Sequence, residues 1–202
     1  MEKKALIVID VQNDFLPGGA LAVPQGDTIL PAVNKLIDHF DHIILTQDWH
    51  PQGHCSFASS HHGKIPYDTI NLDYGSQILW PDHCIQGTQG AEFHSSLKVE
   101  KAQLIFRKSY NKNMDSYSAF FENDQKTPTG LHAYLKENNF AKLALCGLAT
   151  DFCVGFSALH AIKCGFKVSV SLNACAGIDL NGSLNTMLKV MNETGVELLM
   201  AS

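Results

Sequence analysis

Six short and almost uninterrupted apolar runs recur along the chain, and several of them end in a charged residue. Such runs are typical of strands that are buried on both faces of a parallel sheet. The pattern therefore predicts six strands. The runs cover residues 4–10, 42–48, 103–108, 141–147, 167–172 and 196–200.

Amphipathic patterns with helical spacing lie between most of these runs. Apolar residues recur every three or four positions across 29–40 and across 180–191, where Gly195 is the expected stop. Residues 131–138 and 151–163 are two further candidate helices. Strands that alternate with helices predict an α/β fold, with a doubly wound, six-stranded and mainly parallel sheet and helices on both faces.

The region 49–102 breaks this rhythm, because it shows no clear periodicity. A connection of this length without regular structure is uncommon in a compact domain and is usually functional. It contains both tryptophans and six of the ten histidines. We interpret it as a long excursion with short elements of its own, inside a single domain that spans residues 1–202.

Composition and charge narrow the function. The formal net charge of −5 and the absence of a strongly basic stretch argue against nucleic-acid binding. No apolar run approaches the roughly 18 residues that a membrane span needs, and the five apolar residues after the N-terminus are too few for a signal peptide. The six cysteines form no CxxC pair, so no disulfide framework is expected. We therefore expect a cytoplasmic protein.

Three candidate catalytic residues follow from their places at strand ends. Asp10 and Lys108 close two predicted strands, and ligands of doubly wound sheets bind beyond the carboxyl ends of the strands. Cys153 falls at the start of a predicted helix, where the helix N-terminus and a nearby cation would stabilise a thiolate. A neighbouring carboxylate could accept the thiol proton, as covalent catalysis requires.

A second group has the composition of a metal site. Asp48 and His50 are two residues apart, so in an extended segment their side chains point to the same side. A third ligand from the excursion, such as His54 or His83, would complete a set of two histidines and one carboxylate. This set suits zinc, iron(II) or manganese(II) and leaves coordination positions open.

Apolar and aromatic residues fall in loops beside these candidates. Together they could form a small slot for a flat ring. The residues are Phe15, Leu21, Trp80 and Tyr117.

Five motifs, in the right order and at the ends of the right strands, resemble those of the isochorismatase-like cysteine hydrolase superfamily. The elements DWHP and WPDHC are similar to those of its metal-dependent nicotinamidase branch. The resemblance covers nearly the whole chain. The motifs are ALIVIDVQNDF at 5–15, TQDWHP at 46–51, WPDHC at 80–84, RK at 107–108 followed by DSYSAF at 115–120, and CGLATDFCV at 146–154.

The resemblance implies a metal-dependent cysteine amidohydrolase that converts nicotinamide to nicotinate and ammonia through a thioester, and that also deaminates pyrazinamide. It implies Asp10, Lys108 and Cys153 as the catalytic residues. It also implies one divalent metal ion, with zinc expected ahead of iron or manganese, and the ligands would be Asp48, His50 and His83. The expected partner is a small-molecule substrate, and the oligomeric state is not predicted.

The resemblance further implies an oxyanion hole formed by the backbone N–H groups of Ala149 and Cys153, and a cis peptide bond between Leu148 and Ala149. The four loop residues named above would flank the substrate ring. One departure is Phe152, where some relatives have histidine. The roles of His54 and Ser56 beside the metal, and of Cys84, stay open.

Other readings compete with this one. The nearest is an isochorismatase-like amidohydrolase that acts on another small amide or an N-carbamoyl compound without a metal. A phospho-receiver domain would share the fold class but has no place for Cys153 or the histidine-rich excursion. A two-histidine, one-carboxylate iron oxygenase would not have a parallel sheet, and the complete set of Asp10, Lys108 and Cys153 argues against a non-catalytic interaction domain.

Overall fold

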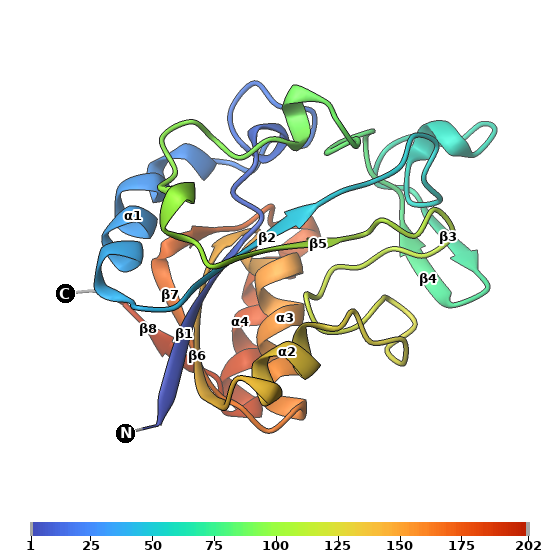
Figure 1. Ribbon diagram of the computed structural model, residues 1–202. Coiled ribbons are helices and arrows are strands. Elements are labelled where there is room, and N and C mark those ends of the chain that lie inside the picture. Colours follow the sequence, from blue (N-terminus) through green and yellow to red (C-terminus); the bar gives the residue numbers. More distant parts are fainter. Residues whose placement is uncertain (1, 201–202) are drawn as a thin grey trace.

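The computed structural model describes residues 2–200, and its centre is a six-stranded parallel sheet (Figure 1). The strand order is β5–β2–β1–β6–β7–β8, and each predicted apolar run overlaps one strand, which confirms the predicted fold class. The strands are β1 (Lys3–Ile9), β2 (Ile43–Asp48), β5 (Leu104–Lys108), β6 (Phe140–Leu148), β7 (Lys167–Ala176) and β8 (Glu197–Leu199).

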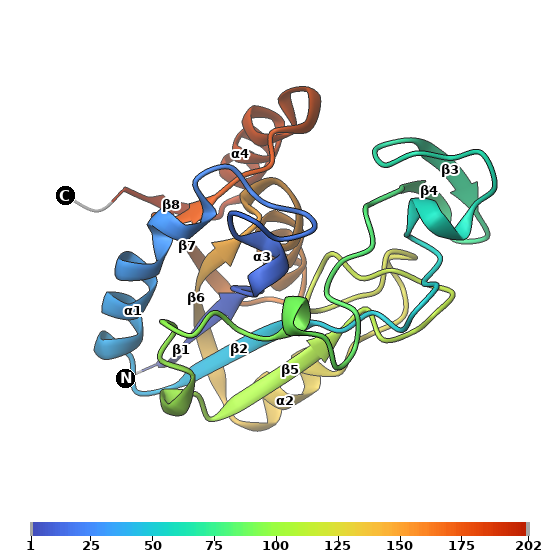
Figure 2. The same cartoon turned by 90° about the horizontal axis from the view of Figure 1, so that it is seen from above.

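Helices lie on both faces of this sheet (Figure 2), and a cluster of buried hydrophobic residues packs on each face. Leu6 and Val8 of β1 pack into one core with α1, while Ala5 and Ile7 point to the other face and pack with α2, α3 and α4. Each fully buried Leu, Ile or Val contributes about 1.5–3 kcal/mol to folding. The uninterrupted apolar run of β1 therefore reflects burial on both faces. The helices are α1 (Leu30–His39), α2 (Leu131–Glu137), α3 (Gly155–Lys163) and α4 (Ser183–Thr194).

Two predicted helices begin differently from expectation. The predicted helix 151–163 starts with a π-helical turn, Thr150–Val154, before α3 begins. The predicted helix 180–191 starts with a short 3₁₀ segment because Asn181 and Gly182 have positive φ, so α4 begins at Ser183. Among residues 2–200, no helix combines the length and the apolar character needed to cross a membrane.

The long excursion lies between two neighbouring strands, β2 and β5, and extends away from the sheet (Figure 1). It contains an antiparallel hairpin of β3 (Thr69–Leu72) and β4 (Gly75–Ile78), together with three short 3₁₀ helices. It therefore has short elements of its own, as predicted. The assignment of the whole chain to one domain stays a prediction.

Gly147 allows β6 to approach β1 just before the strand ends. Its φ of 115° is unfavourable for residues with a side chain, and a Cβ atom would overlap the carbonyl oxygen of Ile9. Ile9 directly precedes Asp10, so this close approach sets where Asp10 leaves the sheet.

We predict that Gly147→Ala lowers the free energy of unfolding by more than the roughly 1–3 kcal/mol of an unfavourable φ alone, because steric overlap is added. Urea unfolding measures the loss. Gly165→Ala is the matched control, since Gly165 also has positive φ (86°) but space for a Cβ, with Lys136 Nζ 3.9 Å away as its only neighbour within 4 Å. Equal losses in the two variants would contradict the packing argument.

Candidate active site

The carboxyl ends of four adjacent strands bring together residues that are far apart in the sequence. Asp10 follows β1, Asp48 ends β2 and Lys108 ends β5, while β6 leads through a tight turn to Cys153. Asp48 and Lys108 are direct partners in the register of β2 and β5. Partners in a parallel register point to the same face, so these two side chains necessarily meet.

The Lys108 ammonium is the centre of this cluster and is fully buried. It lies 2.5 Å from Asp48 Oδ1 and 3.0 Å from Asp10 Oδ2. It also donates a hydrogen bond to the Ser116 carbonyl (2.9 Å) and lies 3.4 Å from Cys153 Sγ. One oxygen of Asp10 lies within 4.8 Å of the same sulfur. The structure thus brings the three predicted catalytic residues together.

Asp10 is held in one orientation by its neighbour on β2. Its φ of 47° is in the left-handed region, and its backbone N–H donates to Thr46 Oγ1 (3.2 Å). The Thr46 hydroxyl in turn donates to Asp10 Oδ1 (2.6 Å). The other oxygen, Oδ2, is buried without an aligned hydrogen bond and is therefore the atom available to take a proton.

Burial governs the protonation of the cluster. It raises the pKa of Cys153 well above that of an ordinary thiol, and the carboxylates raise it further, with only Lys108 opposing them. The thiolate that the sequence predicts at the helix start is therefore not the resting form. Burial also raises the pKa of Asp10, against the effect of Lys108, so this carboxyl group is a better proton acceptor than an exposed one.

Asp48, His50 and His83 form a second cluster directly beside the first. One potential ligand atom from each lies within 4.8 Å of the others, and all three residues are buried. Asp48 Oδ1 is occupied by Lys108 and by Ser109 Oγ (2.8 Å), while Oδ2 lies 3.9 Å from His83 Nε2. Asp48 therefore joins the two clusters.

The histidine rings are oriented as metal ligands require. His83 Nδ1 donates to the Pro81 carbonyl (2.8 Å), which leaves the Nε2 lone pair facing Asp48. Burial lowers the pKa of His83 to about 4, so its ring is neutral at pH 7. His50 Nδ1 is buried and has no hydrogen-bond partner. An orphaned, buried nitrogen beside a carboxylate and a neutral imidazole fits a divalent metal ion.

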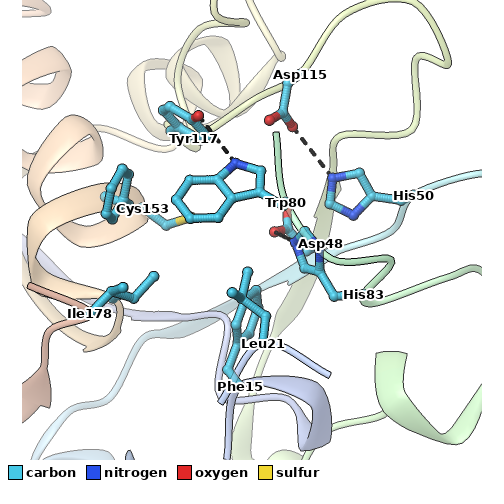
Figure 3. Close-up of a pocket in the computed structure, with 12 residues that line it drawn as sticks. Phe15, Leu21, Asp48, His50, Trp80, His83, Asp115, Tyr117, Cys153 and Ile178 are labelled. Carbon is cyan, nitrogen blue, oxygen red and sulfur yellow. Dashed lines mark hydrogen bonds and ion pairs between the residues drawn. The ribbon is translucent and has the colours of Figure 1, made fainter. Parts of the chain in front are cut away.

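A cavity is lined by residues of both clusters (Figure 3). Cys153 and Ala149 line it on one side, and the three potential metal ligands line it on another. The Trp80 indole N–H donates to the Tyr117 hydroxyl (3.2 Å), and the Trp80 and Phe152 rings meet at 90° with centroids 4.9 Å apart. The four predicted substrate contacts all line this cavity: Phe15, Leu21, Trp80 and Tyr117.

The turn after β6 presents the cysteine. The peptide bond between Leu148 and Ala149 is cis, and the carbonyl of Ala149 accepts hydrogen bonds from the N–H groups of Phe152 and Val154. Ala149 and Cys153, the predicted donors of the oxyanion hole, both line the cavity.

His54 and Ser56, left open by the sequence, are engaged with each other. His54 Nε2 faces the carbonyls of Asn111 (2.9 Å) and Met114 (3.3 Å), so this nitrogen carries the hydrogen. Nδ1 then accepts from the Ser56 hydroxyl (2.8 Å) and N–H (3.2 Å). His54 has no lone pair left for a metal ion.

Three residues near the site received no role from sequence reasoning. Gln12 forms two hydrogen bonds with the backbone of Asp48, both of 2.8 Å, and so fixes the end of β2. Asp115 and Ile178 line the cavity. Ile178 follows β7, where the strand-end rule could have found it, and Asp115 is the first residue of the DSYSAF motif at 115–120, which could have singled it out.

A nucleophilic cysteine beside a carboxyl group and an ammonium, at the strand ends of a doubly wound sheet, defines the class of covalent cysteine hydrolases. Residues 4–201 match the Isochorismatase domain model, and the chain belongs to this family. It is 54% identical to a nicotinamidase of Acinetobacter baylyi over 96% of this chain and 90% of that protein.

Solved structures agree with this assignment. A nicotinamidase and pyrazinamidase of Acinetobacter baumannii is 54% identical, with a TM-score of 0.97 over 99% of this chain and 97% of that one. A pyrazinamidase of Pyrococcus horikoshii in complex with zinc is 37% identical, with a TM-score of 0.80 over 98% of this chain and 99% of that one.

We predict that Lys108→Met lowers the free energy of unfolding of the metal-free protein by about 3–5 kcal/mol, because Asp10 and Asp48 are then buried without a counter-charge. Urea unfolding measures this loss. Lys98→Met is the control, since Lys98 pairs with Asp38 at the surface and Lys101 still contacts that carboxylate. The control should unfold almost as wild type does, and an equally stable Lys108→Met protein would refute the electrostatic account.

Proposed function

We propose that this protein hydrolyses nicotinamide to nicotinate and ammonia, and deaminates pyrazinamide, by covalent catalysis at Cys153. The observation that carries the proposal is the single buried cluster of Cys153, Asp10 and Lys108, whose cysteine lines a cavity that is also lined by two histidines and a carboxylate. The relatives named nicotinamidase and pyrazinamidase, matched over almost the whole chain, support the substrate class.

The first step forms the thioester. Asp10 Oδ2 takes the proton of the Cys153 thiol, and the sulfur attacks the carboxamide carbon of the substrate. Lys108 stabilises the negative charge before and after this transfer, first on Asp10 and then on the sulfur, as well as that of Asp48, because its ammonium contacts all three groups. The backbone N–H groups of Ala149 and Cys153 stabilise the developing oxyanion.

The second step releases the products. Asp10 returns its proton to the departing nitrogen, so that ammonia leaves and a thioester to Cys153 remains. The same carboxylate then takes a proton from a water molecule that attacks the thioester carbon. The C–S bond breaks, Asp10 passes this proton to the Cys153 sulfur, and nicotinate leaves, its own acid proton being lost to solvent. One buried carboxyl group thus acts alternately as base and acid, which suits its raised pKa.

We infer that Asp48, His50 and His83 hold one divalent metal ion, and zinc fits this donor set. The zinc complex of the Pyrococcus horikoshii pyrazinamidase supports the choice. The ion would supply a Lewis-acid site for the pyridine nitrogen of the substrate and so orient the ring. Asp48 serves both clusters through different oxygens, since Lys108 and Ser109 contact only Oδ1.

The apolar walls of the cavity bind the substrate ring. Phe15 and Leu21 come from the segment after β1, whereas Trp80 and Tyr117 come from the excursion and from the segment after β5. Phe152 packs edge-on against the Trp80 ring and narrows the slot. A flat ring of six atoms fits between such walls.

We predict that Cys153→Ala lowers the rate of ammonia release from nicotinamide by at least on the order of 10³-fold, because no other group can form the acyl intermediate. A coupled ammonia assay measures the rate. Cys164→Ala serves as the control, since Cys164 lies at the far end of α3 and should be dispensable. A Cys153→Ala protein as active as wild type would refute the covalent mechanism.

We also predict that the metal-loaded enzyme strongly prefers nicotinamide to benzamide, because benzamide has no ring nitrogen. Removal of the metal by a chelator should abolish most of this preference, and added zinc should restore it. The ratio of kcat/KM for the two amides measures the effect. Equal cleavage of both amides and no response to chelation would favour the alternative, a metal-independent hydrolase for other small amides or N-carbamoyl compounds.

A further inference from the structure

Asp115 is a buried carboxylate that the proposed mechanism does not use. It lies in the loop that follows β5, and its exposed fraction is 2%. Its Oδ1 atom lies 3.3 Å from His50 Nε2 (Figure 3). Asp115 is not part of the group of Asp48, His50 and His83 that forms the proposed metal site, although it contacts His50. This contact therefore requires a separate explanation.

The contacts of Asp115 identify which nitrogen of His50 carries the hydrogen. Asp115 Oδ1 accepts a hydrogen bond from the Ser116 N–H (2.9 Å), and Oδ2 accepts one from Gln77 Nε2 (3.1 Å). The Asp115 carboxylate has no hydrogen to donate, so a hydrogen bond between Asp115 and His50 must be donated by the ring. His50 Nε2 therefore carries a hydrogen. The lone pair of this ring is then on Nδ1, the buried atom without a partner.

A competing role for Asp115 is that of a metal ligand itself. His50, His54 and Asp115 also offer atoms within 4.8 Å of one another. Both nitrogens of His54 are occupied, however, by backbone carbonyls on one side and by Ser56 on the other. The geometry therefore favours Asp115 outside the ligand set, behind His50.

Gln77 ties this carboxylate to the cavity wall. Its side-chain N–H group donates to Asp115 Oδ2 and to the Tyr117 hydroxyl (3.0 Å). Its Oε1 atom accepts from the Tyr74 hydroxyl (2.9 Å) and from Asn123 Nδ2 (3.1 Å). Because Gln77 is almost fully buried on β4, the hairpin of the excursion is part of the support for Asp115.

We propose that Asp115 is a positioning residue that holds the His50 ring in one tautomer and orientation, with Nδ1 presented to the metal ion. The inference rests on the metal site of the proposed function. Carboxylates placed in this way behind a metal-bound histidine fix the ring and raise its basicity, and their loss commonly weakens metal binding about 10–100-fold.

The test measures zinc affinity directly, without substrate. The metal-free full-length protein competes for zinc with a fluorescent chelator, and wild type is compared with Asp115→Asn and Asp115→Ala. We expect a graded loss of zinc affinity. The Asp115→Ala variant has neither the acceptor nor the charge, so it should bind zinc about 10–100-fold more weakly than wild type. The Asp115→Asn variant keeps an acceptor but no charge, so its affinity should lie between the two. The d–d spectrum of the cobalt(II) form should change in the same order.

Asp151→Ala is the matched control for general damage. Asp151 is equally buried and accepts hydrogen bonds from the N–H groups of Ile178 and Asp179 and from the Ser183 hydroxyl, away from the histidines. This variant should lose stability but keep wild-type zinc affinity and the wild-type cobalt spectrum. A loss of affinity as large as that of Asp115→Ala would show a purely structural effect and overturn the inference.

Two further outcomes separate the inference from the proposed function. If wild type binds zinc and both Asp115 variants bind it equally well, the positioning role is refuted while the metal site stands. If wild type itself fails to bind zinc, the proposed metal site is refuted, and the role of Asp115 falls with it.

Discussion

The buried ammonium of Lys108 is the interaction on which the rest of the site depends. Two carboxylates at the same point repel one another, and transfer of the thiol proton to Asp10 keeps two negative charges there, one of them now on the sulfur. Burial strengthens this repulsion. Lys108 contacts Asp10, Asp48 and Cys153 at once. Its own pKa is held well above the usual range by the two carboxylates, although burial opposes them. We therefore expect Lys108 to stay charged, and the proton that moves in the proposed mechanism is the one that passes between Cys153 and Asp10.

The topology of the sheet explains why this cluster forms. Parallel strands place their carboxyl ends at one edge, and the register of β2 and β5 makes Asp48 and Lys108 direct neighbours. Because Asp48 faces Lys108 with one oxygen and His83 with the other, the nucleophile and the proposed metal site have fixed positions relative to each other. An enzyme that must hold a ring at one end and attack an amide at the other needs this fixed spacing.

The strands and most residues of the candidate site could be predicted from the sequence. The apolar runs give the strands because burial on both faces leaves no polar position, and the strand-end rule points to Asp10 and Lys108. The choice of His83 over His54, and the oxyanion-hole role of the Ala149 and Cys153 N–H groups, came from the family resemblance, because spacing alone cannot show which loop residue reaches a site. The π turn before α3, the raised pKa of Cys153 and the contact of Asp115 with His50 depend on packing between distant segments. No local pattern encodes them.

The most direct test of the account is to detect the acyl intermediate. Enzyme that is turning over nicotinamide is quenched with acid, digested and analysed by mass spectrometry. We expect a nicotinoyl group on the peptide that contains Cys153, present during turnover and lost once substrate is exhausted. A nicotinoyl group on another residue, or ammonia release with no acylated cysteine in rapid-quench samples from the first turnover, would contradict it.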